Sequence, residues 1–188
     1  MNNISFESGC GRWLLVKPNV VNHLAAHPGI TEILPDIVSN IILPSDGSKL
    51  ECQVNLNRVV GQSSLLKTDK IDISDKSCFA KRKNRKYASR VVPDEEMEDT
   101  SLVSIIAQPS DSQTYKLVSA WFGPIAQKEP WDPDLADDPS AFEESIRFWC
   151  SHALVYSSDT MLEPFESNWE NILKIAIHNN YGEKYEVK

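Results

Sequence analysis

The sequence predicts a single-domain α+β protein with N-terminal helices, a central and mainly antiparallel sheet, and C-terminal helices packed on one face of that sheet. The chain has 188 residues, a length that usually forms one domain. Its middle carries alternating apolar residues, which are typical of strands, and its end carries apolar residues at helical spacing. The segments lack the regular βαβ alternation of a doubly wound fold, which favours an antiparallel sheet.

The N-terminal part reads as short helical pieces separated by prolines. A helix over residues 18–27 ends at Pro28. Residues 31–44 form either one irregular helix or two short apolar pieces, because Pro35 interrupts them. A strand over residues 49–60, in which apolar and polar residues alternate, then begins the sheet.

The clearest β-hairpin joins residues 101–108 and 115–123. Both segments are rich in the β-branched and aromatic residues that favour strands, and the polar sequence PSDSQT between them is typical of a turn. The loop that follows contains four prolines between residues 123 and 140, which exclude a continuous helix or a central strand.

Two capping boxes predict the C-terminal helices. Ser140 and Glu143 start the first helix, and Ser167 and Glu170 start the second. The first helix has an apolar stripe formed by Phe142, Ile146, Trp149, Ala153 and Tyr156. The second helix has a buried face formed by Trp169, Ile172, Leu173 and Ala176.

Composition and motifs narrow the class of protein. No apolar segment is long enough to span a membrane and no secretory signal pattern begins the chain, so we expect a cytoplasmic protein. The four cysteines are scattered singly, and His23 and His27 are the one close pair of histidines, so we predict neither a disulfide scaffold nor a metal site. The sequence lacks the glycine-rich nucleotide loops and the common hydrolase motifs, so we predict no cofactor.

One strongly basic segment lies between residues 81 and 90, and it is a candidate RNA site despite the formal net charge of −8. Its cations are Lys81, Arg82, Lys83, Arg85, Lys86 and Arg90. Lysine and arginine can bind phosphates, protonate a leaving oxygen and stabilise the charge of a phosphorane. We predict catalytic roles for Arg82, Arg85 and Arg90, substrate contacts for Lys81 and Lys83, and stacking of a base on Tyr87 or Trp121. The plainer alternative is a solvated strand edge, whose charges the five acids at 94–99 neutralise.

The succession AKRKNRKYASRVV, an acidic turn, SLVSIIAQ, a turn and YKLVSAWFG resembles the sheet region of small bacterial ribonuclease toxins of the barnase, EndoU, colicin and RelE type. The resemblance covers roughly residues 75–133, and Ser119 to Gly123 stand where many of these toxins have a Thr-Ala-aromatic-x-Gly run. It implies metal-independent RNA cleavage, with Ser119 beside the reacting centre and an antitoxin as protein partner. Several of these toxins place a histidine before the basic segment, where this chain has Ser77, Cys78 and Phe79. No catalytic base is therefore identified, and whether the protein is an enzyme stays open.

Two other classes of function remain. A non-enzymatic binding module, such as an immunity or accessory component, would recognise a protein partner such as a toxin through the acidic aromatic loop. The candidate contact residues on that loop are Glu129, Trp131, Asp132 and Asp134. A structural protein of a phage or mobile element would instead pair the basic and acidic segments between copies.

Overall fold

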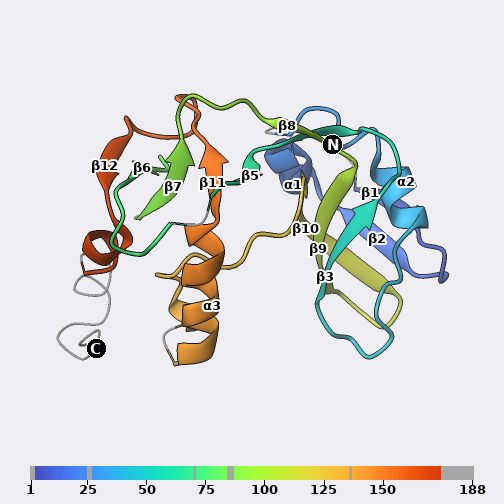
Figure 1. Cartoon of the computed structure of the whole chain (residues 1–188). Coiled ribbons are helices and arrows are strands. Elements are labelled where there is room, and N and C mark those ends of the chain that lie inside the picture. The colour runs from blue at the N-terminus through green and yellow to red at the C-terminus, as the bar shows by residue number, and fades with distance from the viewer. Residues whose placement is uncertain (1–2, 25–26, 70, 84–86, 136, 175–188) are drawn as a thin grey trace. The chain divides into compact units, whose positions relative to one another are not determined.

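The structure is a computed structural model that describes residues 3–24, 27–69, 71–83, 87–135 and 137–174 (Figure 1). The chain forms two compact units, and each unit combines two separate stretches of sequence. Unit 1 comprises Met1–Ser63 and Glu98–Ile125, and unit 2 comprises Ser64–Met97 and Ala126–Lys188. The single domain predicted from the chain length stays a prediction.

Unit 1 is built around a five-stranded sheet with the order β1-β2-β10-β9-β3. These strands are β1 (Ile4–Glu7), β2 (Trp13–Val16), β10 (Thr114–Phe122), β9 (Leu102–Pro109) and β3 (Leu50–Asn55). All neighbouring strands are antiparallel except β2 and β10, which are parallel. A second, two-stranded sheet pairs β4 (Gly61–Ser63) with β8 (Glu98–Thr100).

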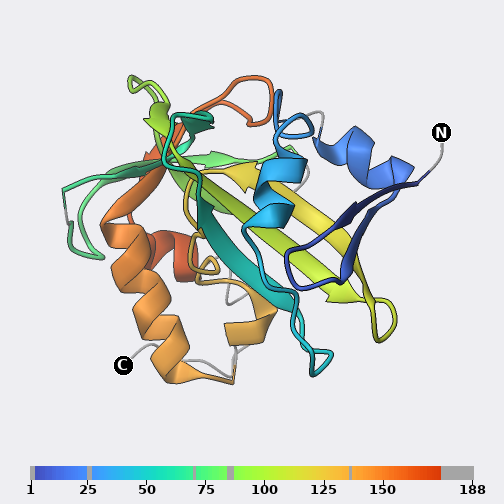
Figure 2. The same cartoon turned by 90° about the vertical axis from the view of Figure 1, so that its right-hand side faces the viewer.

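Two short helices pack on the apolar face of the large sheet of unit 1. They are α1 (Pro18–Leu24) and α2 (Leu34–Ser39), and Figure 2 shows α2 lying in front of the strands. The alternation of side chains along β9 and β10 sends Ile105, Ala120 and Phe122 into the same core as the helices. The predicted hairpin is confirmed, and so is a helix that begins at Pro18. The strand predicted over residues 49–60 exists as β3 (Leu50–Asn55), but it does not begin the sheet, because β1 and β2 precede it in the chain.

Unit 2 contains a second five-stranded sheet with the order β12-β6-β7-β11-β5. Its strands are β12 (Phe165–Ser167), β6 (Ser77–Lys81), β7 (Ala88–Val92), β11 (His152–Val155) and β5 (Leu65–Lys67). β7 and β11 are parallel, and the other neighbours are antiparallel. The basic segment of the sequence thus runs from the end of β6 into β7, and its residues 84–86 lie outside the described residues.

The helices of unit 2 are a 3-10 turn η1 (Pro133–Leu135), helix α3 (Pro139–Cys150) and a helical segment at residues 169–174. Its core is aromatic and includes Phe79, Trp131, Trp149 and Trp169. In the part of the chain that the structure describes, no helix has the length and apolar character required to cross a membrane.

The predicted α+β class is wrong. The described residues contain twelve strands in three sheets and only short helices, and the chain begins with strands β1 and β2 instead of helices. The helix predicted through Tyr156 ends at Cys150, because the apolar residues that follow it enter β11 and pair with β5 and β7. The C-terminal helices packed on one face of a central sheet are not found, and Ala176 lies outside the described residues.

The capping residues also differ from the predicted ones. Asp138 caps α3, where its carboxylate accepts a hydrogen bond from the Ala141 amide at 3.0 Å, with Pro139 in the first turn. At the next helical segment, Asn168 accepts a bond from the Asn171 amide at 2.9 Å, while Ser167 belongs to β12. Each helix therefore begins near the predicted position with a different capping side chain.

Candidate functional site

The four predicted catalytic residues do not form one described cluster. Arg82 and Arg90 belong to unit 2, whereas Ser119 belongs to unit 1. Arg85 lies outside the described residues.

Arg90 is a buried structural residue. Its Nη1 donates to the carbonyl oxygens of Cys150 at 2.8 Å and Trp149 at 3.2 Å, which are the last two residues of α3. The same guanidinium donates to the hydroxyls of Ser77 at 2.8 Å and Thr68 at 3.0 Å. Desolvation lowers the pKa of the Arg90 guanidinium, while the negative end of the α3 dipole favours its charge. Arg90 thus caps a helix from the middle of a sheet, with no described carboxylate as its partner.

Arg82 lies directly after β6 and faces the carboxylate of Glu129, from the acidic loop. The Nη2 of Arg82 is 3.8 Å from Oε1 of Glu129, and the two side chains are 30% and 13% exposed. The buried hydroxyl of Ser89, on β7, donates a hydrogen bond to the same carboxylate oxygen. The structure therefore joins the basic segment and the acidic loop, which the sequence assigned to two different functions.

One donor of the Arg82 guanidinium is buried without an acceptor. Its Nε has no acceptor within the described residues, and the contact of its Nη2 with Glu129 is longer than a hydrogen bond. A guanidinium carries five N–H donors, and leaving a buried one unpaired costs free energy. An oxyanion with several acceptor oxygens, such as a phosphate, would fit this donor set.

The side chains around this pair are cationic and aromatic. Lys81 and Lys83 are exposed, and the ammonium group of Lys83 donates to the Ser158 carbonyl at 3.0 Å. Tyr87 is half-buried, and its ring centroid lies 5.7 Å from that of Trp131. We name the group formed by Lys81, Arg82, Lys83, Tyr87, Ser89 and Glu129 the Arg82 cluster.

The acidic loop uses most of its predicted contact residues internally. Trp131 is 7% exposed and packs against Trp169, so it forms part of the core. The carboxylate of Asp132 accepts the Asp134 amide at 3.0 Å, and Asp134 pairs with Lys128. Trp131 is therefore not available to a protein partner, whereas the Asp134 side chain stays 72% exposed.

The two remaining predicted residues lie on β10 of unit 1. Trp121 is half-buried, and its Nε1 donates to the Pro124 carbonyl at 3.2 Å. Ser119 follows a β-bulge in the pairing with β9 and lies opposite Ile106. The structure describes no cationic partner for Trp121.

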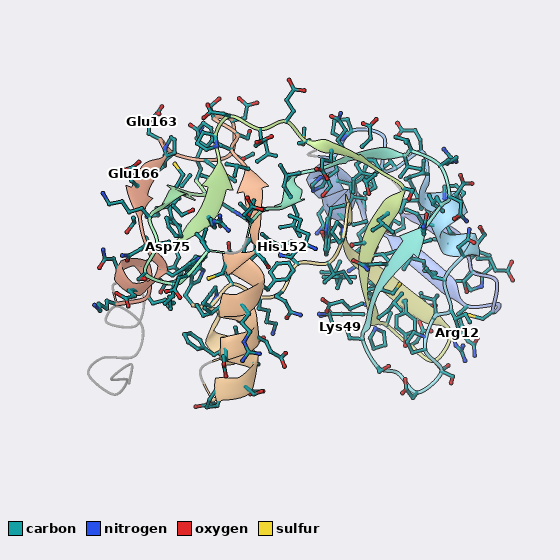
Figure 3. All side chains as sticks on the ribbon, viewed as in Figure 1. Arg12, Lys49, Asp75, His152, Glu163 and Glu166 are labelled. Atoms are coloured by element: carbon teal, nitrogen blue, oxygen red, sulfur yellow. The ribbon has the colours of Figure 1, made fainter. Side chains whose placement is uncertain are left out.

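His152, at the start of β11, has a fixed orientation. A carbonyl oxygen can only accept, so Nδ1, which is 2.9 Å from the Phe148 oxygen, donates. The imidazole of His152, which Figure 3 labels, also stacks on the ring of Phe148, with the ring centroids 4.0 Å apart. This histidine is half-buried and held by the end of α3, and no group of three or more potential metal ligands occurs in the described part of the chain.

Sequence reasoning missed two groups. The first is Ser89, whose hydrogen bond to Glu129 depends on the tertiary structure that brings β7 beside the acidic loop. No sequence signal links the two residues. Cys10 is exposed, and the Ser8 hydroxyl, 3.1 Å from its sulfur, lowers the pKa of its thiol to about 7 against the opposing effect of desolvation. The sequence signal that could have indicated a reactive Cys10 was Arg12, two residues later, because a nearby cation favours the thiolate.

Comparison with known proteins gives no family. No protein-family model matches the chain, and no curated protein matches it in sequence. Among solved structures, a conserved hypothetical protein from Toxoplasma gondii ME49 is similar, with 10% sequence identity and a TM-score of 0.47. The alignment covers 71% of this chain and 88% of that one.

Proposed function

We propose that unit 2 binds the phosphate backbone of RNA at the Arg82 cluster and cleaves it by a metal-independent reaction. The observation that carries this proposal is the guanidinium of Arg82, whose buried Nε has no acceptor among the described residues and whose Nη2 lies 3.8 Å from the carboxylate of Glu129. A phosphate would supply the missing acceptors. The neighbouring carboxylate would supply the base that the sequence motif lacks.

The chemistry assigns one role to each group. Glu129 takes the proton of a ribose 2′-hydroxyl through Oε2, which has no partner in the described part of the chain. The 2′-oxygen then bonds to phosphorus, the bond to the 5′-oxygen breaks, and that oxygen takes a proton from water. Arg82 stabilises the charge of the phosphorane. The products are a 2′,3′-cyclic phosphate and a 5′-hydroxyl end.

Binding would rely on several charges and one ring. Lys81 and Lys83 flank Arg82 and are exposed to the solvent, where they can contact neighbouring phosphates. Three neutralised phosphates on a single strand give a slope of about −2 in a plot of log affinity against log salt concentration. Tyr87 offers part of its ring to an unpaired base.

The experiment measures binding and cleavage of a labelled mixed-sequence RNA by the wild-type protein and three variants in the presence of EDTA. Glu129→Gln should retain RNA binding and lose cleavage by about 100-fold or more, since the amide cannot act as a base. Arg82→Ala should lose both binding and cleavage. Arg58→Ala is the matched control, because Arg58 is an exposed arginine of unit 1 that pairs with Asp36. Wild-type protein that is folded and neither binds nor cleaves RNA would refute the proposal.

The other two classes of function receive less support. The binding module was expected to expose Trp131, which is buried. A structural protein that pairs basic and acidic segments between copies would form an oligomer that dissociates in salt, and sedimentation at two salt concentrations tests it.

A further inference from the structure

The outer strand of unit 2 leaves one side of its backbone without a partner. Residues 160–167 run antiparallel beside β6, with the Leu162 amide donating to the Lys81 carbonyl at 2.8 Å and Phe165 opposite Phe79. β12 is the last strand of its sheet, so in the described part of the chain no strand pairs with its other side. Unpaired backbone N–H and C=O groups at a sheet edge can pair with an added strand.

The side chains at this edge combine apolar and acidic character. Leu162 is 50% exposed and Phe165 is 43% exposed, so both offer apolar surface to a partner. Glu163 and Glu166 are exposed, and Figure 3 shows both at the outer margin of unit 2, where Figure 1 labels β12. We name residues 160–167 the β12 edge.

Residues 160–167 contain two carboxylates, Glu163 and Glu166, and no lysine or arginine. The cations Lys81 and Lys83 lie beside the start of this edge, where the Lys83 amide donates to the Thr160 carbonyl and the Leu162 amide donates to the Lys81 carbonyl. Neither of the two carboxylates forms an ion pair with another described residue. Desolvation raises the pKa of the Cys78 thiol, and the charge of Glu166, its register partner on β12, raises it further.

We infer that the β12 edge binds an extended basic peptide segment of another protein, which adds a strand beside Phe165–Ser167. Successive side chains of a strand alternate between the two faces of a sheet. A partner strand would therefore place an apolar residue beside Phe165 and a lysine or arginine beside Glu166. The recognised sequence alternates apolar and basic residues.

The negative charge of the β12 edge favours a basic peptide over a second copy of the chain as the added strand. Two β12 edges brought together would place carboxylates beside carboxylates, and like charges on adjacent strands are destabilising. Pro164 also removes one N–H from the edge, which limits pairing to a short stretch. A short basic segment satisfies both constraints.

The experiment measures fluorescence anisotropy of a labelled eight-residue peptide of alternating lysine and valine at low salt. We expect the double variant Glu163→Gln, Glu166→Gln to bind about fivefold more weakly, since it loses two exposed charge pairs. The matched control, Glu143→Gln with Glu144→Gln on α3, removes the same charge from another exposed surface and should bind like the wild type. A peptide of alternating glutamate and valine should not bind.

Two further measurements test the added strand itself. The same basic peptide with alternate backbone amides N-methylated cannot complete the hydrogen-bonded ladder and should lose binding, and the unmethylated peptide should slow exchange of the β12 amide hydrogens. Equal binding of the methylated peptide, or equal affinity of the Glu163 and Glu166 double variant, would overturn the inference. A wild-type dimer that Phe165→Ser dissociates would also overturn it, because the edge would then belong to a second copy.

Discussion

Replacement of Arg90 by alanine tests whether this arginine holds the fold of unit 2 or contacts RNA. Its guanidinium donates to the carbonyls of Trp149 and Cys150 and to the hydroxyls of Ser77 and Thr68. These groups come from the end of α3, from β6 and from the segment after β5. The substitution would therefore remove one donor group that connects three parts of unit 2.

The magnitude follows from the bonds that are lost. Hydrogen bonds from a charged donor contribute about 1.5–3 kcal/mol each, and the buried acceptors left behind cost about 1–3 kcal/mol each. Relief of the desolvation penalty on the buried charge offsets several kcal/mol of this sum. We expect Arg90→Ala to lower the free energy of unfolding by about 3 kcal/mol, and Arg90→Lys to lower it by roughly half as much, since an ammonium replaces only some of the bonds.

Urea unfolding followed by tryptophan fluorescence measures this change. The control is Lys81→Ala, because Lys81 is exposed on the adjacent strand and should change the free energy of unfolding by less than about 0.5 kcal/mol. A loss below about 1 kcal/mol for Arg90→Ala, together with lost RNA binding by the folded variant, would contradict the structural role.

Three further predictions concern a helix cap, a glycine and a thiol. Asp138→Ala should lower the free energy of unfolding by about 1 kcal/mol, whereas Ser140→Ala should leave it nearly unchanged, and equal losses would instead favour the capping box. Gly123→Ala should cost about 3 kcal/mol or more in thermal unfolding, because its φ is +99° and a Cβ would lie 2.3 Å from a neighbouring hydroxyl; Gly47→Ala, with φ +76° and open space, should cost only about 1 kcal/mol. The rate of Cys10 alkylation should rise with pH to half its maximum near pH 7, since the lowered thiol pKa populates the thiolate there, and a midpoint near 9 measured by mass spectrometry would contradict it.

Local sequence patterns predicted several elements correctly. The hairpin of β9 and β10 followed from alternation and a polar turn, and α1 followed from a short apolar face ended by a proline. The start of α3 was predicted within two residues, with Ser140 as the expected cap and Asp138 as the observed one. Several residues near the start of a helix can act as its cap, so the position is predicted better than the capping residue. The end of α3 was missed because Ala153 and Tyr156 fit a helical stripe by spacing alone, while the same stretch also suits a strand.

The candidate site was predictable only in part. The density of cations identified Arg82, and the acidic loop identified Glu129. Nothing in the sequence indicated that these two side chains, 47 residues apart in the chain, face each other. Arg90 belongs to the same basic segment as Arg82, yet the structure buries it. A count of charges cannot tell which of them point inward, because that depends on which face of the strand meets the core.

The sequence by itself determined the β9–β10 hairpin, the strand β3 and the starts of α1 and α3, and it determined that a basic segment and an acidic loop exist. Only the tertiary structure decided that the chain forms two units, each from two separate stretches, with parallel pairs between β2 and β10 and between β7 and β11. The physical reason is that alternation along a strand specifies a buried face and not its partner. Pairing between distant strands is fixed by the packing of whole faces, and that packing also brings Arg82 to Glu129 and turns Arg90 into a helix cap.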